Sequence, residues 1–182
     1  MKILTIVAVV AASLGVVGAA AAQDAPSLRD LERSKASFIS VNEEFAEAAW
    51  PNMVAPYNRT QAGLGDEFPG KEWNDEDRAV FGCAYDKLVE TDQMASFQKF
   101  QEMNAAMAKE FGENESITVI ELFGVEDDNP LMLTFYEQDE ATFEAMADVL
   151  NGCGAGDLAM KRMQETDLMN RVFGVIAEQM GQ

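Results

Sequence analysis

Apolar side chains recur at intervals of three and four residues through most of this chain, and this period is typical of amphipathic α-helices. The first such segment starts at Ser27, a residue suited to cap a helix, and continues to Trp50–Pro51. Its stripe consists of Leu31, Ser34, Phe38, Val41, Phe45 and Ala48. The period therefore predicts a mainly α-helical protein.

Four further segments repeat this period, so the sequence predicts a bundle of about five helices. Their residue ranges are 74–88, 97–111, 143–150 and 157–180. Asn74 and Asp157 are suited to cap the helices that follow them, and Gly112 is suited to end the second segment. The segment 97–111 is either separate from the helix at 74–88 or continuous with it.

Residues 116–136 have a different pattern. Ile117–Val125 and Leu131–Tyr136 are rich in β-branched and aromatic residues, and Glu126–Pro130 between them has the composition of a turn. We therefore expect one β-hairpin packed on the bundle. Short apolar runs are equally compatible with buried turns of helix, so an all-α protein is the alternative.

Residues 51–73 contain three prolines and three glycines and show no period, which predicts a long loop. Trp50, Tyr57, Phe68 and Trp73 lie along this segment. We interpret these aromatic residues as anchors that hold the loop on the bundle, because isolated loop aromatics usually pack. The alternative is that they contact a binding partner.

Residues 1–22 have the pattern of a secretory signal peptide: Lys2, a long apolar run, and small residues before a cleavage site between Ala22 and Gln23. An uncleaved membrane anchor is the alternative. Residues 23–182 are expected to form a single acidic, mainly helical domain without a further membrane span. The predicted location is therefore periplasmic or secreted.

Cys83 and Cys153 are the only cysteines, and neither belongs to a CxxC motif. An oxidising compartment allows them to pair, so we predict a structural disulfide, worth up to about 4 kcal/mol in the chain-entropy description. The Gly-rich link at 152–156 would let Cys153 reach Cys83. Two buried thiols are the alternative.

The charge and the absence of histidine exclude several classes of function. The chain has 13 Lys and Arg against 32 Asp and Glu, for a net charge of −19, which argues against binding nucleic acid or anionic membranes. Without histidine there is no Ser-His-Asp site, no HExxH zinc site and no haem attachment. No catalytic residue and no cofactor is predicted, although a carboxylate-only hydrolase stays possible in principle.

Residues 110–160 contain many carboxylates and no basic residue. This acidic region could attract a basic protein or a cation, but a solvated, repulsive surface is the simpler interpretation. Glu126–Asn129 offers oxygen ligands for calcium, and Asp75–Asp77 is a second cluster. Neither has the EF-hand spacing, so no metal ligand is assigned.

Eleven methionines are the last candidate, with pairs at helical spacing, Met103 with Met107 and Met160 with Met163. Thioethers are suited to Cu(I), but methionine more commonly fills gaps in helical cores or lines grooves for partners.

We therefore expect an exported, acidic helical protein with a non-catalytic binding or envelope-associated role, and a metal-binding protein is the alternative. Exposure of the stripe at Met163, Met169 and Phe173 would support a binding groove.

Overall fold

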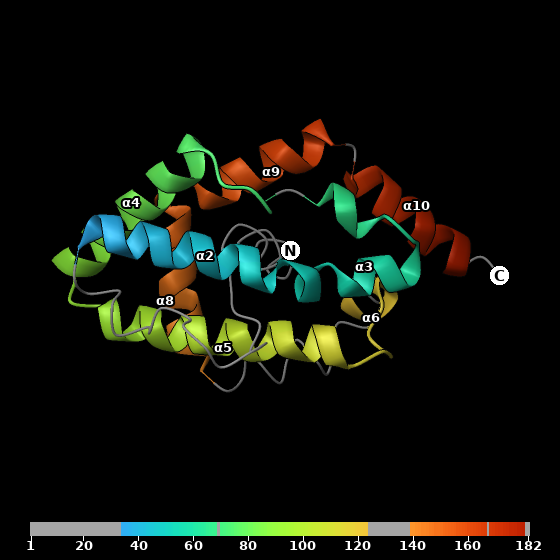
Figure 1. Ribbon diagram of the computed structural model, residues 1–182, viewed down its shortest axis with the longest axis horizontal. Coiled ribbons are helices and arrows are strands. Elements are labelled where there is room, and N and C mark those ends of the chain that lie inside the picture. Colours follow the sequence, from blue (N-terminus) through green and yellow to red (C-terminus); the bar gives the residue numbers. More distant parts are fainter. Residues whose placement is uncertain (1–33, 69, 124–138, 167, 181–182) are drawn as a thin grey trace.

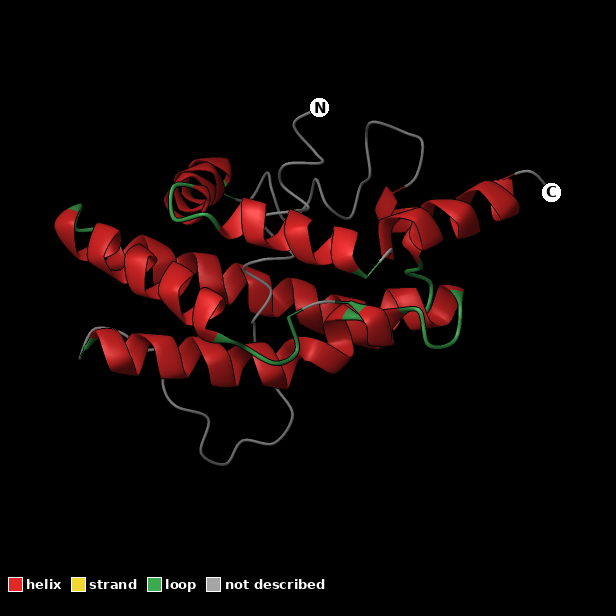
Figure 2. Cartoon of the chain, turned by 90° about the horizontal axis from the view of Figure 1, so that it is seen from above, coloured by secondary structure: helices red, strands yellow, loops and turns green. Residues whose placement is uncertain are grey.

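The computed structural model describes residues 34–68, 70–123, 139–166 and 168–180. These residues form α-helices joined by short connections, and no strand occurs among them (Figures 1 and 2). The prediction of a mainly α-helical bundle is confirmed. The predicted signal peptide lies outside the described residues. No helix in the described ranges combines the length and apolarity needed to cross a membrane.

Two long helices, α2 (Lys35–Met53) and α5 (Met94–Glu113), run side by side in the same direction (Figure 1). The rings of Phe38 and Phe97 meet with centroids 5.0 Å apart, at equivalent positions of the repeated tripeptide Ala-Ser-Phe. The Ser34 hydroxyl caps α2 by accepting a hydrogen bond from the Ser37 amide at 3.1 Å. The expected cap, Ser27, lies outside the described residues.

Two further helices complete the main core. α4 (Asp75–Glu90) packs against α2, α8 (Glu140–Asn151) packs against α5, and α4 and α8 also touch each other. The predicted cap of α4 is confirmed, because Asn74 and Asp77 form a capping box. The largest fully buried side chains of this core are Phe38, Leu88, Phe97, Phe100, Met107, Met146 and Leu150.

The predicted last helix, 157–180, is two helices, α9 (Ala155–Glu165) and α10 (Leu168–Met180). α9 starts after Gly154, whose φ of +87° suits glycine, and not after Asp157. α9 ends at Thr166, whose hydroxyl donates to the Arg162 carbonyl at 3.1 Å and so competes with helix continuation. The sequence does not indicate this break, because apolar residues keep their three-and-four spacing on both sides of Thr166.

Residues 51–73 are not one long loop as predicted. α2 continues through Pro51, and a short helix, α3 (Ala55–Thr60), follows with Pro56 in its first turn, then a 3-10 helix, η2 (Gly65–Glu67). Proline is tolerated in a first turn because the amide there has no intrahelical acceptor.

The predicted hairpin at 116–136 is not supported. Part of its first strand is a short helix, α6 (Val119–Phe123), and residues 124–136 lie outside the described ranges. The Glu121 carboxylate accepts a hydrogen bond from the Thr118 amide at 2.9 Å, an arrangement that favours a helix start. α3, α6 and α10 enclose a second apolar cluster, made of Tyr57, Leu64, Val119, Leu168, Val172 and Ile176. The all-α alternative therefore fits the described residues.

Candidate functional site

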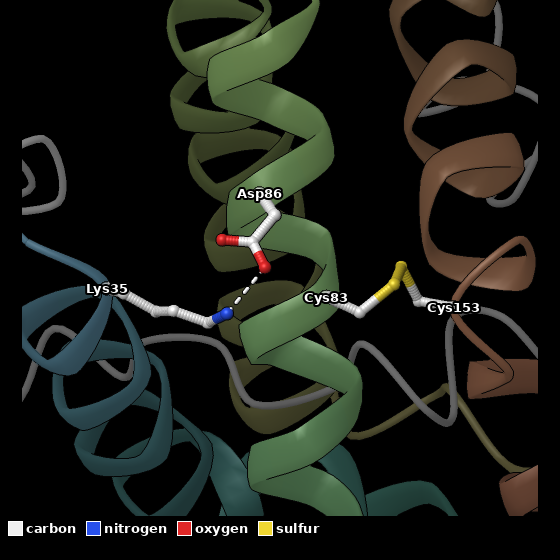
Figure 3. The surroundings of a disulfide bond; sticks show 4 residues. All are labelled: Lys35, Cys83, Asp86 and Cys153. Carbon is white, nitrogen blue, oxygen red and sulfur yellow. Dashed lines mark hydrogen bonds and ion pairs between the residues drawn. A yellow bond between two sulfur atoms is a disulfide. The ribbon is translucent and has the colours of Figure 1, made fainter.

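The predicted disulfide is confirmed. Cys83 of α4 is bonded to Cys153 in the turn between α8 and α9, with a Cα–Cα distance of 5.7 Å (Figure 3). On the other side of α4, Lys35 pairs with Asp86 at 2.5 Å. The disulfide therefore ties α4 to the α8–α9 turn, and the solvent-exposed Lys35–Asp86 pair joins α4 to α2.

The acidic cluster at Asp75–Asp77 is occupied by basic side chains of this chain. Asp77 accepts two hydrogen bonds of 2.7 Å from Arg162, and Glu76 accepts one of 2.9 Å from Lys161. Asp75 lies 3.6 Å from Arg78. These contacts join the start of α4 to α9, and we call Glu76, Asp77, Lys161 and Arg162 the α4–α9 junction. The carboxylates of this junction neutralise cations of the protein and are not presented to a metal ion.

The resolved pKa shifts among the described carboxylates are all downward. The Lys161 ammonium lowers the pKa of Glu76, the Thr118 hydroxyl lowers that of Glu121, and the Lys99 ammonium lowers that of Asp139. A carboxylate-only hydrolase requires an acid whose pKa is raised. The pKa values of Glu76, Glu121 and Asp139 are shifted in the opposite direction.

The acidic region 110–160 is described only in part, because the proposed calcium loop, Glu126–Asn129, lies outside the described residues. Within them, no group of three His, Cys, Asp or Glu side chains could hold a metal ion. Glu113 of α5 and Asp148 of α8 are exposed to solvent. Lys99 of α5 forms an ion pair with Asp139, the residue that caps α8.

The two methionine pairs differ in burial. Met107 and Met163 are buried, Met103 packs against the core, and Met160 is 39% exposed. Members of the second pair therefore have different surroundings, and the buried methionines fill the core.

The four aromatic residues of segment 50–73 anchor it to the bundle, as interpreted from the sequence. Phe68 contacts Trp50 at a ring centroid distance of 6.0 Å and Tyr57 at 4.8 Å. Trp73 contacts Phe81 of α4 at 4.4 Å. Burial raises the pKa of the Tyr57 phenol, which keeps it protonated.

The stripe expected to line a groove is divided between core and surface. Met163 is buried, Met169 is partly buried, and Phe173 is 49% exposed. The core face of α10 consists instead of Leu168, Val172 and Ile176. Their i, i+4, i+8 spacing is legible in the sequence, but the neighbouring methionines and Phe173 have the same spacing. Phe173 is thus the large aromatic side chain that α10 leaves half exposed.

Two polar features were missed from the sequence. Arg59 of α3 donates hydrogen bonds to the carbonyls of Phe111, Gly112 and Ile117, at 2.7, 2.8 and 3.2 Å. Three carboxamides are buried between α2 and α5: Asn42, Gln101 and Asn104. Polar residues within the apolar stripes could have identified the carboxamides, whereas no local pattern predicts the long-range contacts of Arg59.

No known protein family or curated protein matches the sequence, and no solved structure matches the fold.

Proposed function

We propose that this chain is an exported or envelope-associated, non-catalytic binding protein whose partner carries basic and apolar groups. The observation that carries the proposal is the half-exposed Phe173 on α10 of this strongly acidic protein, a helix whose opposite face packs into the second apolar cluster. Aromatic side chains that remain exposed are common anchors of protein interfaces.

Charge supports a basic partner. α10 packs against α6 and α9, and exposed carboxylates are present on all three helices: Glu121, Glu165 and Glu178. A net charge of −19 repels another acidic molecule and attracts a cationic one. A basic amphipathic helix offers both the charge and the apolar face that this surface would contact.

Export is the second part of the proposal. The signal-peptide pattern of residues 1–22 supports it, and so does the Cys83–Cys153 disulfide, because disulfides persist in oxidising compartments.

The binding proposal can be tested by calorimetric titration of residues 23–182 with a helical peptide of Leu and Lys at amphipathic spacing. A peptide with Gln in place of Lys is the ligand control. We expect Phe173→Ser to weaken binding about tenfold. Val89→Ser is the matched variant, since Val89 is 56% exposed on α4, away from this surface. Equal effects of the two variants, or equal binding of both peptides, would contradict the proposal.

A further inference from the structure

Three carboxamide side chains form a polar cluster inside the parallel α2–α5 pair. Asn42 and Gln101 are each 1% exposed, and Asn104 is fully buried. The Asn42 Nδ2 group donates to the Phe38 carbonyl at 2.7 Å, and Gln101 Nε2 donates to Asn42 Oδ1 at 2.6 Å. The first bond lies within α2, and the second connects α2 to α5. Together they give partners to both polar atoms of the Asn42 side chain and to Gln101 Nε2.

The remaining polar atoms of the cluster have no hydrogen-bond partner among the described residues. The unpaired atoms are Gln101 Oε1 and both polar atoms of the Asn104 side chain, Oδ1 and Nδ2. Burying a carboxamide without replacing its hydrogen bonds to water is unfavourable, so such groups in folded proteins normally have a partner.

The residues around Asn104 cannot supply that partner. On α5 its neighbours one turn away on either side, Phe100 and Met107, are buried and apolar. Ala49 of α2 and Ala108 of α5, one turn further along the helices, are fully buried and too small to crowd the cluster. None of these four side chains carries a polar group that could pair with Asn104 or with Gln101 Oε1.

We propose that a buried water molecule binds in the α2–α5 interface between Gln101 and Asn104. The water donates a hydrogen bond to Gln101 Oε1 and accepts one from Asn104 Nδ2, or donates to Oδ1 if the carboxamide is turned over. Water suits the cluster because it both donates and accepts. A cation would match only the oxygens and an anion only Nδ2, and either would be an uncompensated buried charge.

The direct test is NMR of uniformly labelled residues 23–182, measuring cross-peaks between water and the Asn104 side-chain amide protons. A bound water gives nuclear and rotating-frame Overhauser peaks of opposite sign, whereas chemical exchange gives peaks of the same sign. Opposite signs at Asn104 are expected. Absence of such peaks at both Asn104 and Gln101 would overturn the proposal.

A variant provides the second test. Asn104→Leu removes both polar atoms, keeps the branching and the number of heavy atoms of the side chain, and leaves Gln101 Oε1 without its bridge. If the water is bound, the urea midpoint of unfolding falls; if the cluster is dry, the midpoint rises because two unpaired polar atoms have been removed. Met107→Leu, one turn away on the same buried face, is the matched control and should change the midpoint little. A rise for Asn104→Leu would refute the water site, and the NMR result on the unmodified chain decides the question if this variant does not fold.

Discussion

Asp77 and Arg162 lie 85 residues apart in the sequence and are joined by two parallel hydrogen bonds of 2.7 Å. Their side chains are only 12% and 15% exposed, and the same Asp77 carboxylate also accepts from the Asn74 amide at 2.7 Å. One carboxylate therefore both completes the capping box of α4 and holds α9 against it.

We expect Arg162→Met to lower the free energy of unfolding by about 3 kcal/mol, because it leaves Asp77 buried without its counter-charge. Lys161→Met is the matched control, since Lys161 pairs with Glu76 in an exposed position where solvent screens the interaction. Urea unfolding of both variants measures the difference. Equal losses of unfolding free energy in the two variants would show that the buried Asp77–Arg162 pair contributes no more than the exposed Glu76–Lys161 pair.

Stability should fall on acidification. Hydrogen bonds from Lys161 and Lys99 lower the pKa values of Glu76 and Asp139 below their ordinary values of 4.5 and 3.8. The unfolded chain takes up these protons first, so the stability conferred by the two pairs is present above the ordinary values and is lost as the pH falls through the lowered ones.

Unfolding free energies at pH 7, 4 and 3 measure this effect. The double variant Lys99→Gln/Lys161→Gln should show a shallower dependence on pH over the same interval. A slope identical to that of the unmodified protein would assign the acid sensitivity to other carboxylates.

Reduction of the disulfide should destabilise the protein by about 2–4 kcal/mol, because the bond joining Cys83 to Cys153 restricts the unfolded chain. Thermal melts with and without reductant test this. The double variant Cys83→Ala/Cys153→Ala should melt at a lower temperature and no longer respond to reductant. A response that persists in the variant would have a different cause.

The leader should be removed during export. Mass spectrometry of the protein from its own envelope fraction is expected to give a chain that begins at Gln23 and lacks two hydrogens at the paired cysteines. A mass that includes residues 1–22 would indicate an anchored protein instead.

Local patterns predicted what depends on local interactions. The start of α4 at Asn74 follows from capping, and α8 ends at Asn151, one residue beyond the range 143–150 that its apolar period predicts. The pairing of Cys83 with Cys153 needed only the count of cysteines and the expected compartment.

Features that depend on tertiary packing could not be predicted in the same way. α6 forms in an apolar run whose composition also suits a strand, and its burial against α3 and α10 decides the outcome. The orientation of α10 was missed because two adjacent stripes share one spacing, and only contact with Tyr57 and Leu64 selects Val172 over Phe173 for the core.

The parallel course of α2 and α5 has a kinetic consequence. Helices that run in the same direction cannot be joined by a tight turn, and the bond between Asn42 and Gln101 spans 59 residues of sequence. Bringing such distant segments together costs loop-closure entropy before any packing is gained. α4 turns the chain back between them, because its ion pairs join Lys35 to Asp86 and Glu43 to Arg78 in antiparallel register with α2. We therefore expect the α2–α5 contact to form later in folding than the contact between α4 and α5, which only a short turn separates.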